Sequence, residues 1–585
     1  MIKNVLLKVS KIGNLVLSWF NFFMFFAMRP CWSGISKTLS EAFGFGDNPP
    51  EWLLFLPVII WVVLFVIAVT TTALFLTKKK EKNLWSYILN GVNVVFLAAV
   101  MVVIALGAID YLDYIWPNFF TYVGIVVATL MVIFFVFVYP KTTLKDNKVF
   151  KLGVVGVFCL TVLANLVNFT FNSITTGAVV YAVEDEYQIV FSSKTQSRAW
   201  VEIDGVRYFD NYNGSNRSYT KIHKVRVPMN ILDEAKAYSI HSQKITYRGP
   251  FGGFFGRDIS IDYTFRPVDV SDGFKYYSLS DIHMAGDAAA KAAAYMQDKE
   301  LLVLAGDIVS MMDTYYDANL VNVYANQITK GEIAVVNARG NHEIKGKYAE
   351  EFHNFVGTKG DSFYYNFYLG GENGVYGVVL DIGEDHDDDY WEYYDTSYYE
   401  AYRAEQVKFL ENESKKDLSK YAYRLAVCHI PVVFINSRKN HKEAKEKMTE
   451  HLNKMDIDMM ISGHQHDLFI FEKDTVEYNE KGKMEYNPDY YSGSNGEIKK
   501  YGGLVTDHDF PNILVSKRGY TQTDSAKLTN TKSQIGMGTT VDFVANTQTC
   551  VFNNSKGEKV SVVNAFAKIN YGEAVVFDLT TKKHI

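Results

Sequence analysis

The chain has 585 residues, of which 48% are hydrophobic and 21% are charged, and its formal net charge is −6. This length exceeds that of one ordinary domain, and so small a net charge argues against a nucleic-acid partner. The four cysteines lie far apart and form no CxxC pair, which argues against a zinc ribbon or a disulfide-stapled domain.

The first third of the sequence contains four long apolar runs, at about 52–76, 85–109, 119–139 and 150–169. Each run is long enough to cross a hydrocarbon core of about 30 Å. Together they predict a transmembrane α-helical bundle over residues 1–172. The runs hold no carboxylate or histidine, which favours an anchor over a transporter. A shorter run at 14–28 fits a fifth span, an interfacial segment or an uncleaved signal anchor.

Lysine placement gives this predicted bundle an orientation. The lysines gather in two of the three loops between the long runs, at Lys78, Lys79, Lys80, Lys82, Lys141, Lys145 and Lys148. Because basic loops stay in the cytoplasm, the chain after residue 172 is expected on the extracytoplasmic side. The sequence therefore predicts a multi-pass protein of the cell membrane, with the lipid bilayer as a partner.

Residues 180–268 show a different pattern, of short β-type runs with turn signals between them. Branched and aromatic residues dominate 187–191, 199–203 and 224–227, and Asp204-Gly205 and Asn213-Gly214 are typical turn pairs. This pattern predicts a small antiparallel β-sandwich. We expect it to be a spacer or docking surface without chemistry of its own.

The remaining chain, 270–585, alternates strand-like apolar runs with helical stretches, notably at 288–299 and 399–416. Five runs end directly at short polar motifs; they are 274–280, 301–305, 333–336, 423–428 and 459–462. Such alternation predicts an α/β sheet, whose ligand site lies beyond the carboxyl ends of its strands. The motifs should therefore meet at one edge.

The motifs supply imidazole, carboxylate and amide groups. In chain order they are Asp281-x-His283, Gly306-Asp307, Gly340-Asn341-His342-Glu343, His429 and Gly463-His464-Gln465-His466. Each motif alone is ordinary loop chemistry, and a single histidine such as His429 is more often a core residue. The ordered set favours borderline divalent cations, which bind these groups.

Two cations about 3.5–4 Å apart need a shared ligand and can activate a bridging hydroxide. Asp307 is suited to bridge them, because it follows a central strand. The residual positive charge of such a pair suits a phosphate anion. His342 can donate a proton to the leaving oxygen. Glu343 is expected to support the ligands from behind without binding metal.

The pattern DxH, GD, GNH[ED], H and GHxH resembles the calcineurin-like metallophosphoesterases, over roughly residues 274–467. The resemblance implies a β-sandwich core flanked by helices, with two divalent cations. It implies one cation held by Asp281, His283, Asp307 and His466. It implies a second held by Asp307, Asn341, His429 and His464, with His342 as the acid.

Some features resemble the purple acid phosphatase branch of that family, namely the preceding β-rich region, Leu380–His386 and Tyr402-Arg403. Two positions depart from this branch. Ser310 stands where the branch has a Tyr ligand to ferric iron, and His283 stands where it has no His ligand. We therefore expect a colourless Mn, Zn or Fe(II)-type centre without a charge-transfer chromophore.

Three further segments lack an assigned role. The acidic insert 384–389 fits a solvated loop better than a Ca²⁺ site. The aromatic residues at 390–394 and 398–399 suit a cleft wall or a surface lid equally. The tail 468–585 is expected to finish the sheet and to add a β-rich accessory region.

These observations predict a membrane-anchored metallophosphoesterase, an enzyme that hydrolyses phosphate mono- or diesters outside the cytoplasmic membrane by attack of a metal-bound hydroxide. Phosphorylated small molecules and lipid-linked or envelope phosphates are the expected substrates. The alternative is a catalytically silent, membrane-tethered binding or sensing protein on the same scaffold. No ligand position is missing, which favours the enzyme.

Overall fold

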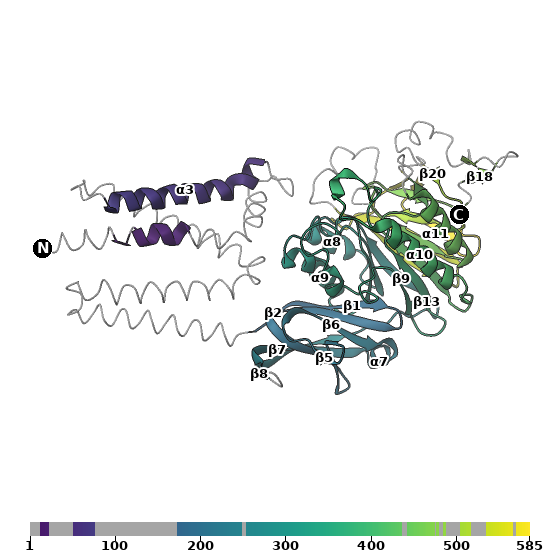
Figure 1. Cartoon of the computed structure of the whole chain (residues 1–585). Helices are drawn as coiled ribbons and strands as arrows, with labels where there is room; N and C mark the ends of the chain where they lie inside the picture. The colour runs from purple at the N-terminus through teal and green to yellow at the C-terminus, as the bar shows by residue number, and fades with distance from the viewer. Residues whose placement is uncertain are drawn as a thin grey trace. The chain divides into compact units, whose positions relative to one another are not determined.

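The computed structural model describes residues 12–13, 15–22, 51–76, 172–248, 253–435, 441–473, 476–478, 484–486, 504–515, 534–564 and 569–585 (Figure 1). The chain divides into two compact units, Met1–Phe169 and Thr170–Ile585. We describe each unit by itself.

In the first unit, residues 15–22 are helical and pack against helix α3 (Glu51–Leu76). The Phe22 ring stacks on Trp61 with centroids 5.4 Å apart, and Ser18 Oγ lies 3.2 Å from Thr71 Oγ1. Leu64 of α3 is also buried. The contacts between the two helices thus include a polar pair as well as aromatic rings.

The predicted transmembrane bundle is not seen, and this part of the predicted fold class is wrong. Within the described part of the chain, no helix has both the length and the apolar character that crossing a membrane requires. An apolar sequence shows that a segment avoids water, but it does not determine the length of the helix that forms or the elements against which that helix packs. The runs at 85–109, 119–139 and 150–169, and part of 14–28, lie outside the described residues.

The second unit is built on two large mixed sheets. The first has the order β26-β23-β22-β9-β10-β11-β1-β2-β7-β8, with β3 and β6 also pairing with β2. Its strands are β1 (Ile174–Val183), β2 (Glu186–Ile203), β3 (Val206–Phe209), β6 (Thr220–Pro228), β7 (Ala237–Arg248), β8 (Gly253–Thr264), β9 (Gly273–Leu279), β10 (Leu301–Ala305), β11 (Ala334–Ala338), β22 (Ile535–Asp542), β23 (Thr547–Asn554) and β26 (Val575–Asp578).

The second sheet has the order β12-β13-β14-β16-β21-β17. Its strands are β12 (Tyr365–Leu369), β13 (Val375–Leu380), β14 (Tyr423–Cys428), β16 (Met459–Ser462), β17 (Phe469–Phe471) and β21 (Asn512–Leu514). Four small pairs complete the described strands: β4 (Asn211–Tyr212) with β5 (Ser215–Asn216), β15 (Phe434–Ile435) with β20 (Leu504–Val505), β18 (Val476–Tyr478) with β19 (Met484–Tyr486), and β24 (Val562–Val563) with β25 (Asn570–Gly572).

Helices cover the two sheets on opposite sides (Figure 1). They are α7 (Met229–Ala235), α8 (Gly286–Ala293), α9 (Tyr315–Thr329), α10 (Tyr399–Glu413) and α11 (Lys442–Lys454), with short 3-10 turns η5 (Phe352–Asn354) and η6 (Trp391–Tyr393). Helix α9 begins at a capping box, in which Thr314 and Asp317 satisfy each other's backbone N–H groups. The alternation of helices and strands in this unit confirms the predicted α/β class.

Strand β13 shows where the core lies. Val375 and Val379 point into the large core shared by the two sheets, whereas Tyr376 and Val378 belong to the core beneath α10 and α11. Alternate residues of a strand face opposite sides of its sheet. The second sheet is therefore buried on both faces, which explains the near-continuous apolar sequence of its parallel strands.

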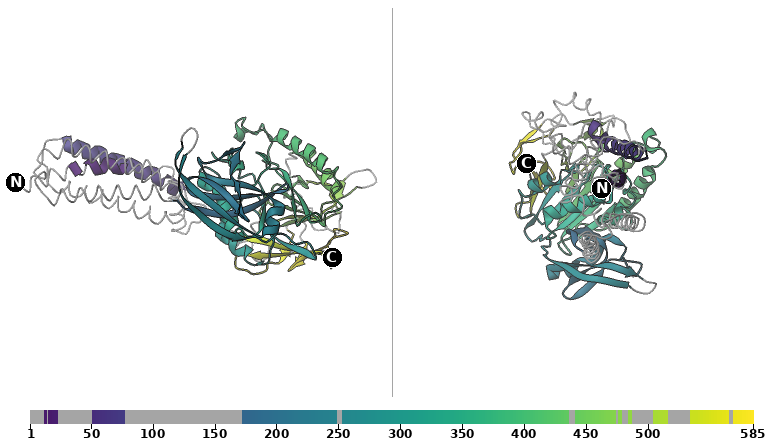
Figure 2. Two further views of the ribbon diagram at one scale, coloured as in Figure 1. Left: turned by 90° about the horizontal axis from the view of Figure 1, so that it is seen from below. Right: turned by 90° about the vertical axis from the view of Figure 1, so that its left-hand side faces the viewer.

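The predicted separate β-sandwich is also corrected. Strand β1 pairs in parallel with β11, with Val180 opposite Ala334, and β2, β7 and β8 extend the same sheet. In Figure 2 the blue strands of residues 174–264 and the yellow C-terminal strands lie in one body with the teal strands. Local alternation identifies antiparallel strands, but it does not specify a distant pairing partner. The boundaries proposed at 180–268 and 270–585 stay predictions.

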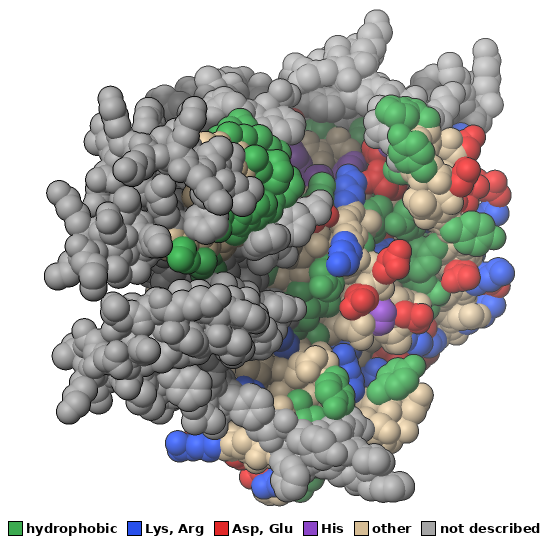
Figure 3. Space-filling model, turned by 60° about the vertical axis from the view of Figure 1, so that its left-hand side comes forward, with side chains coloured by type: hydrophobic (Ala, Val, Ile, Leu, Met, Phe, Trp, Pro, Cys, Tyr) green, Lys and Arg blue, Asp and Glu red, His purple; other side chains and the backbone are tan. Residues whose placement is uncertain are grey.

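The arrangement of parallel strands positions the polar motifs. Strands β9, β10 and β11 are mutually parallel, as are β13, β14 and β16. The carboxyl ends of parallel strands lie at one edge of a sheet, so the loops that follow them are neighbours. Elsewhere on the surface, acidic and basic side chains are interspersed over the face shown in Figure 3, in keeping with the small net charge.

Candidate metal centre

The predicted ligands lie in loops that directly follow the carboxyl ends of five strands. Asp281 and His283 follow β9, and Asp307 follows β10. Asn341 and His342 follow β11, His429 follows β14, and His464 and His466 follow β16. The structure thus brings all eight side chains to a common region.

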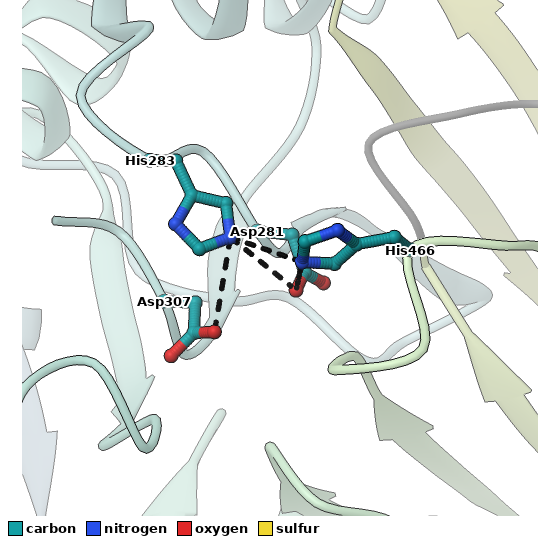
Figure 4. Close-up of side chains that lie close together, drawn as sticks. All are labelled: Asp281, His283, Asp307 and His466. Carbon is teal, nitrogen blue, oxygen red and sulfur yellow. Dashed lines mark hydrogen bonds and ion pairs between the residues drawn. The ribbon is translucent and has the colours of Figure 1, made fainter. Parts of the chain in front are cut away.

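A first group consists of Asp281, His283, Asp307 and His466, each with a ligand atom within 4.8 Å of the others. His466 Nε2 lies 3.2 Å from Asp281 Oδ1, and His283 Nε2 lies 3.8 Å from Asp307 Oδ2. The two Nε2 atoms are themselves 3.0 Å apart. Figure 4 shows both imidazoles turned toward the two carboxylates. This donor set could hold a metal ion.

A second group consists of Asp307, His429 and His464, again within 4.8 Å. His429 Nε2 lies 3.1 Å from Asp307 Oδ2, and Asn341 Oδ1 lies 3.2 Å from His464 Nδ1. Asp307 therefore belongs to both groups, and its Oδ2 atom faces histidines of each. A carboxylate shared in this way is what two neighbouring cations need.

The backbone at these ligands has an uncommon conformation. Asp281, His283, Asp307, His464 and His466 all have positive φ angles, between 45° and 74°. Such angles cost of order 1–3 kcal/mol for residues with a side chain, and they persist where the surrounding structure fixes them. Hydrogen bonds between the loops after β9 and β10 support this conformation at Asp281 and His283, from Asp281 N to Gly306 O and from His283 N to Asp307 O, each 3.0 Å.

Two glycines let the loops approach one another. Gly306 has a φ of 83°, and a Cβ there would lie 2.6 Å from the Cβ of His429. A Cβ at Gly340 would collide with Asp307 Oδ1 and backbone N. These contacts give a physical reason for the glycines in the second and third motifs.

Glu343 is buried, and it supports the loops that follow β10 and β11. Its carboxylate accepts hydrogen bonds from four backbone N–H groups, those of Asp307, Ile308, Val309 and Gly340, at 2.6–3.0 Å. Glu343 thereby ties the loop after β10 to the loop after β11. Its contacts are with backbone N–H groups at and beside the candidate ligands, and its supporting role stays a prediction.

The electrostatics of the centre suit a cation. Burial lowers the pKa of His283 to about 4, so its ring is neutral at physiological pH. Burial would also lower the pKa of His429, but the carboxylate of Asp307 raises it to about 10. Burial would raise the pKa of Asp307, yet the charge of His429 holds it well below its usual range. A proton on His429 therefore balances carboxylate charge that a metal ion would otherwise balance.

Among the ligands of the two groups, two buried atoms have no hydrogen-bond partner in the described part of the chain: Asp281 Oδ1 and His429 Nε2. Each lies near a neighbouring ligand, but without hydrogen-bond geometry. An unsatisfied buried polar atom is costly, so such atoms call for a partner. Their convergence with neutral imidazole and carboxylate donors fits the metal ions that the sequence predicted.

His342 lies at the rim of this arrangement. Its Nδ1 donates to the carbonyl oxygen of Ser310 at 2.8 Å, and its Nε2 lies 3.9 Å from Asp307 Oδ2. The side chain is 31% exposed, so a substrate can reach it. The hydrogen bond to Ser310 fixes the ring and leaves Nε2 as the atom that exchanges a proton.

Two carboxylates of the acidic insert 384–389, which the sequence analysis expected to be a solvated loop, lie beside the second group. Glu384 is only 5% exposed and accepts a hydrogen bond from Asn341 Nδ2 at 2.8 Å, and Asp385 Oδ2 lies 3.6 Å from His464 Nε2. Burial would raise the pKa of Asp385, but the nearby imidazole of His464 holds it well below its usual range. The available signal was position, because both residues follow β13 at the same sheet edge.

Comparison with known proteins adds independent findings. Residues 274–468 match the family model described as calcineurin-like phosphoesterase. A search of curated protein sequences found no match. Among solved structures, a purple acid phosphatase from yellow lupin (Lupinus luteus) seeds is 12% identical, with a TM-score of 0.40, over 66% of this chain and 73% of that one.

Two further solved structures are similar at the same low level of identity. PhoD is 10% identical with a TM-score of 0.38, over 70% of this chain and 91% of that chain. GAP50, described as the anchor in the inner membrane complex of Plasmodium, is 12% identical with a TM-score of 0.31, over 52% and 89%. Residues 274–468 are thus similar to calcineurin-like phosphoesterases, and both groups of candidate metal ligands lie within this stretch.

Proposed function

We propose that the chain is a phosphoester hydrolase that uses two divalent cations, of Mn, Zn or Fe type. The observation that carries this proposal is the shared position of Asp307, whose Oδ2 atom lies 3.1 Å from His429 Nε2 and 3.8 Å from His283 Nε2. Asp281, His283, Asp307 and His466 would hold one cation. Asp307, Asn341, His429 and His464 would hold the other. When bound, such a pair supplies Lewis acidity toward a phosphoryl oxygen and lowers the pKa of water.

The charge of the centre supports a phosphate substrate. Two divalent cations carry more positive charge than Asp281 and Asp307 neutralise, and the histidine and asparagine ligands add no negative charge. The site therefore keeps a net positive charge when loaded. A phosphate mono- or diester is the anion that such a centre recognises.

His342 is positioned to serve the leaving group. Its Nε2 is near the centre but makes no contact shorter than 3.9 Å with Asp307, and it is open to solvent on its other side. The hydrogen bond from its Nδ1 to Ser310 O holds the ring in place. In the proposed reaction Nε2–H donates a proton to the departing oxygen, which is general acid catalysis.

The proposed substrate is a phosphorylated small molecule, or a lipid-linked or envelope phosphate ester. The extracytoplasmic placement, like the bilayer as a partner, stays a prediction from lysine positions.

The test uses the full chain, purified with its metals counted. Turnover is measured with and without added Mn²⁺ on an aryl phosphomonoester and on the matching diester. Metal-dependent hydrolysis of either ester, lost in Asp307→Ala, supports the proposal. Two bound metals without turnover of either ester point instead to a binding protein on this scaffold, and absence of bound metal contradicts the proposal.

A further inference from the structure

We infer that Glu384 and Asp385 are positioning residues, which orient Asn341 and His464 toward the cation of the second group. The inference rests on the proposed function, because it concerns one of the two cations. Glu384 and Asp385 are adjacent in the sequence and follow β13, the parallel neighbour of β14. Neither residue belongs to the two groups of ligands described above.

Glu384 determines which way the amide of Asn341 points. An amide presents an oxygen on one side and an NH₂ group on the other, and only the oxygen can bind a cation. A carboxylate accepts hydrogen bonds, so the Asn341 atom that faces Glu384 Oε1 at 2.8 Å is the nitrogen, Nδ2. Asn341 Oδ1 is therefore turned the other way, to 3.2 Å from His464 Nδ1.

Asp385 acts on His464 in a parallel manner. The two ring nitrogens of His464 face different partners: Nδ1 faces Asn341 Oδ1, and Nε2 faces Asp385 Oδ2 at 3.6 Å. A carboxylate behind a histidine favours the proton on the nearer nitrogen, which leaves the lone pair on the other one. Without a cation, His464 Nδ1–H donates to Asn341 Oδ1; with the proton on Nε2, beside Asp385, the Nδ1 lone pair would be available to a cation.

Both carboxylates have a further polar neighbour. Tyr393 OH donates to Glu384 Oε2 at 2.7 Å, and His386 Nδ1 lies 2.7 Å from Asp385 Oδ1. The two oxygens of Glu384 are therefore engaged by Asn341 and Tyr393, and those of Asp385 face His464 and His386. Although Glu384, Asp385 and His386 lie close enough to hold a metal ion, their existing contacts favour a supporting role.

The test measures binding of Mn²⁺ alone to the full chain, by calorimetric titration and by metal counting after gel filtration. Wild type is expected to bind two Mn²⁺ ions. In Glu384→Ala and Asp385→Ala, the Kd of one Mn²⁺ should rise about 10- to 100-fold while the other stays unchanged. Glu384→Gln keeps a hydrogen-bond acceptor for Asn341, so it should recover most of the lost affinity.

Asp389→Asn is the matched control, because Asp389 is an exposed residue of the same acidic segment. It should bind both ions as wild type does. Circular dichroism and metal-free thermal unfolding show whether each variant is folded, and Glu384→Gln keeps the test decisive if an alanine variant does not fold.

Three results would overturn the inference. One is folded alanine variants that bind both ions with wild-type Kd, and another is an equal loss at both sites. The third is a folded Glu384→Gln that recovers no affinity. Wild type that binds fewer than two Mn²⁺ ions would instead contradict the proposed function, so the two failures are distinguishable.

Discussion

Two clusters of histidine and aspartate in this unit use the same residue types in opposite ways. In the first sheet, Ser197 Oγ lies 2.9 Å from His223 Nε2, and His223 Nδ1 lies 3.1 Å from Asp210 Oδ2. This is the order of groups found in a nucleophilic triad. All three residues are buried, however, and none of their side chains has a buried polar atom without a partner.

The metal centre differs in both respects. Asp281 Oδ1 and His429 Nε2 are buried without a hydrogen bond, and His342 is 31% exposed beside them. The cluster of Ser197, Asp210 and His223 is a sealed network, whose polar atoms need no further ligand and whose role is to hold the sheet together. The metal centre has unsatisfied and accessible polar atoms, and it therefore needs a ligand. Residue types alone do not separate a structural cluster from a chemical one, whereas partner count and access do.

The largest expected effect tests the metal centre. Asp307→Ala removes the carboxylate shared by both groups, so several kcal/mol of charge stabilisation should be lost. At about 1.4 kcal/mol per tenfold, kcat/KM for an aryl phosphate should fall at least about a thousandfold, with loss of bound metal. Asp210→Asn, the same residue type in the sealed network, should leave turnover per folded molecule unchanged. Retained turnover in Asp307→Ala would contradict the assignment of the site.

The next effect separates the proton donor from the metal ligands. His342→Gln should lower turnover about 10²- to 10⁴-fold, the usual contribution of a general acid, without changing the amount of bound Mn²⁺. The loss should be larger for an alkyl ester than for a nitrophenyl ester, because nitrophenolate leaves without a proton. Equal losses for the two esters, measured side by side, would argue against this role.

In the sealed network, a substitution should affect stability and leave catalysis intact. His223→Ala removes the imidazole that joins the buried side chains of Ser197 and Asp210, and the free energy of unfolding should fall by about 2–4 kcal/mol. Urea unfolding measures this change. A drop in kcat of the folded variant would mean that the two clusters are not independent.

The smallest effect concerns the proton on His429. Its pKa of about 10 lies above its usual 6.5, so in the metal-free protein the ring holds a proton through neutral pH. A cation must displace that proton, so affinity should rise with pH and level off above about 10. The Kd for Mn²⁺ should fall about tenfold per pH unit between about 7 and 9. Calorimetry in buffers of different ionisation enthalpy counts the proton released, and no release would refute the linkage.

Much of the centre could be predicted, since each ligand follows an apolar run that becomes a parallel strand. Asp307 and His429 are examples: their strands β10 and β14 have the predicted bounds. For Glu384 and Asp385 the positional signal was weak, because a run of charged residues usually lies in solvent, and only the fold shows Glu384 buried and bonded to Tyr393 of η6. The pairing of β1 with β11 has no local signal either, since hydrogen bonds between distant strands leave no mark on periodicity.

The order of strands in the first sheet also bears on synthesis. Strand β9, which leads into Asp281 and His283, lies between β10 and β22, and β22 comes from residues 535–542. While the ribosome is still making the intervening residues, β9 has one unpaired edge, which invites pairing with other chains. A truncation before residue 535 would leave that edge exposed permanently. The DxH motif therefore depends on a strand made some 250 residues later, although no ligand comes from it.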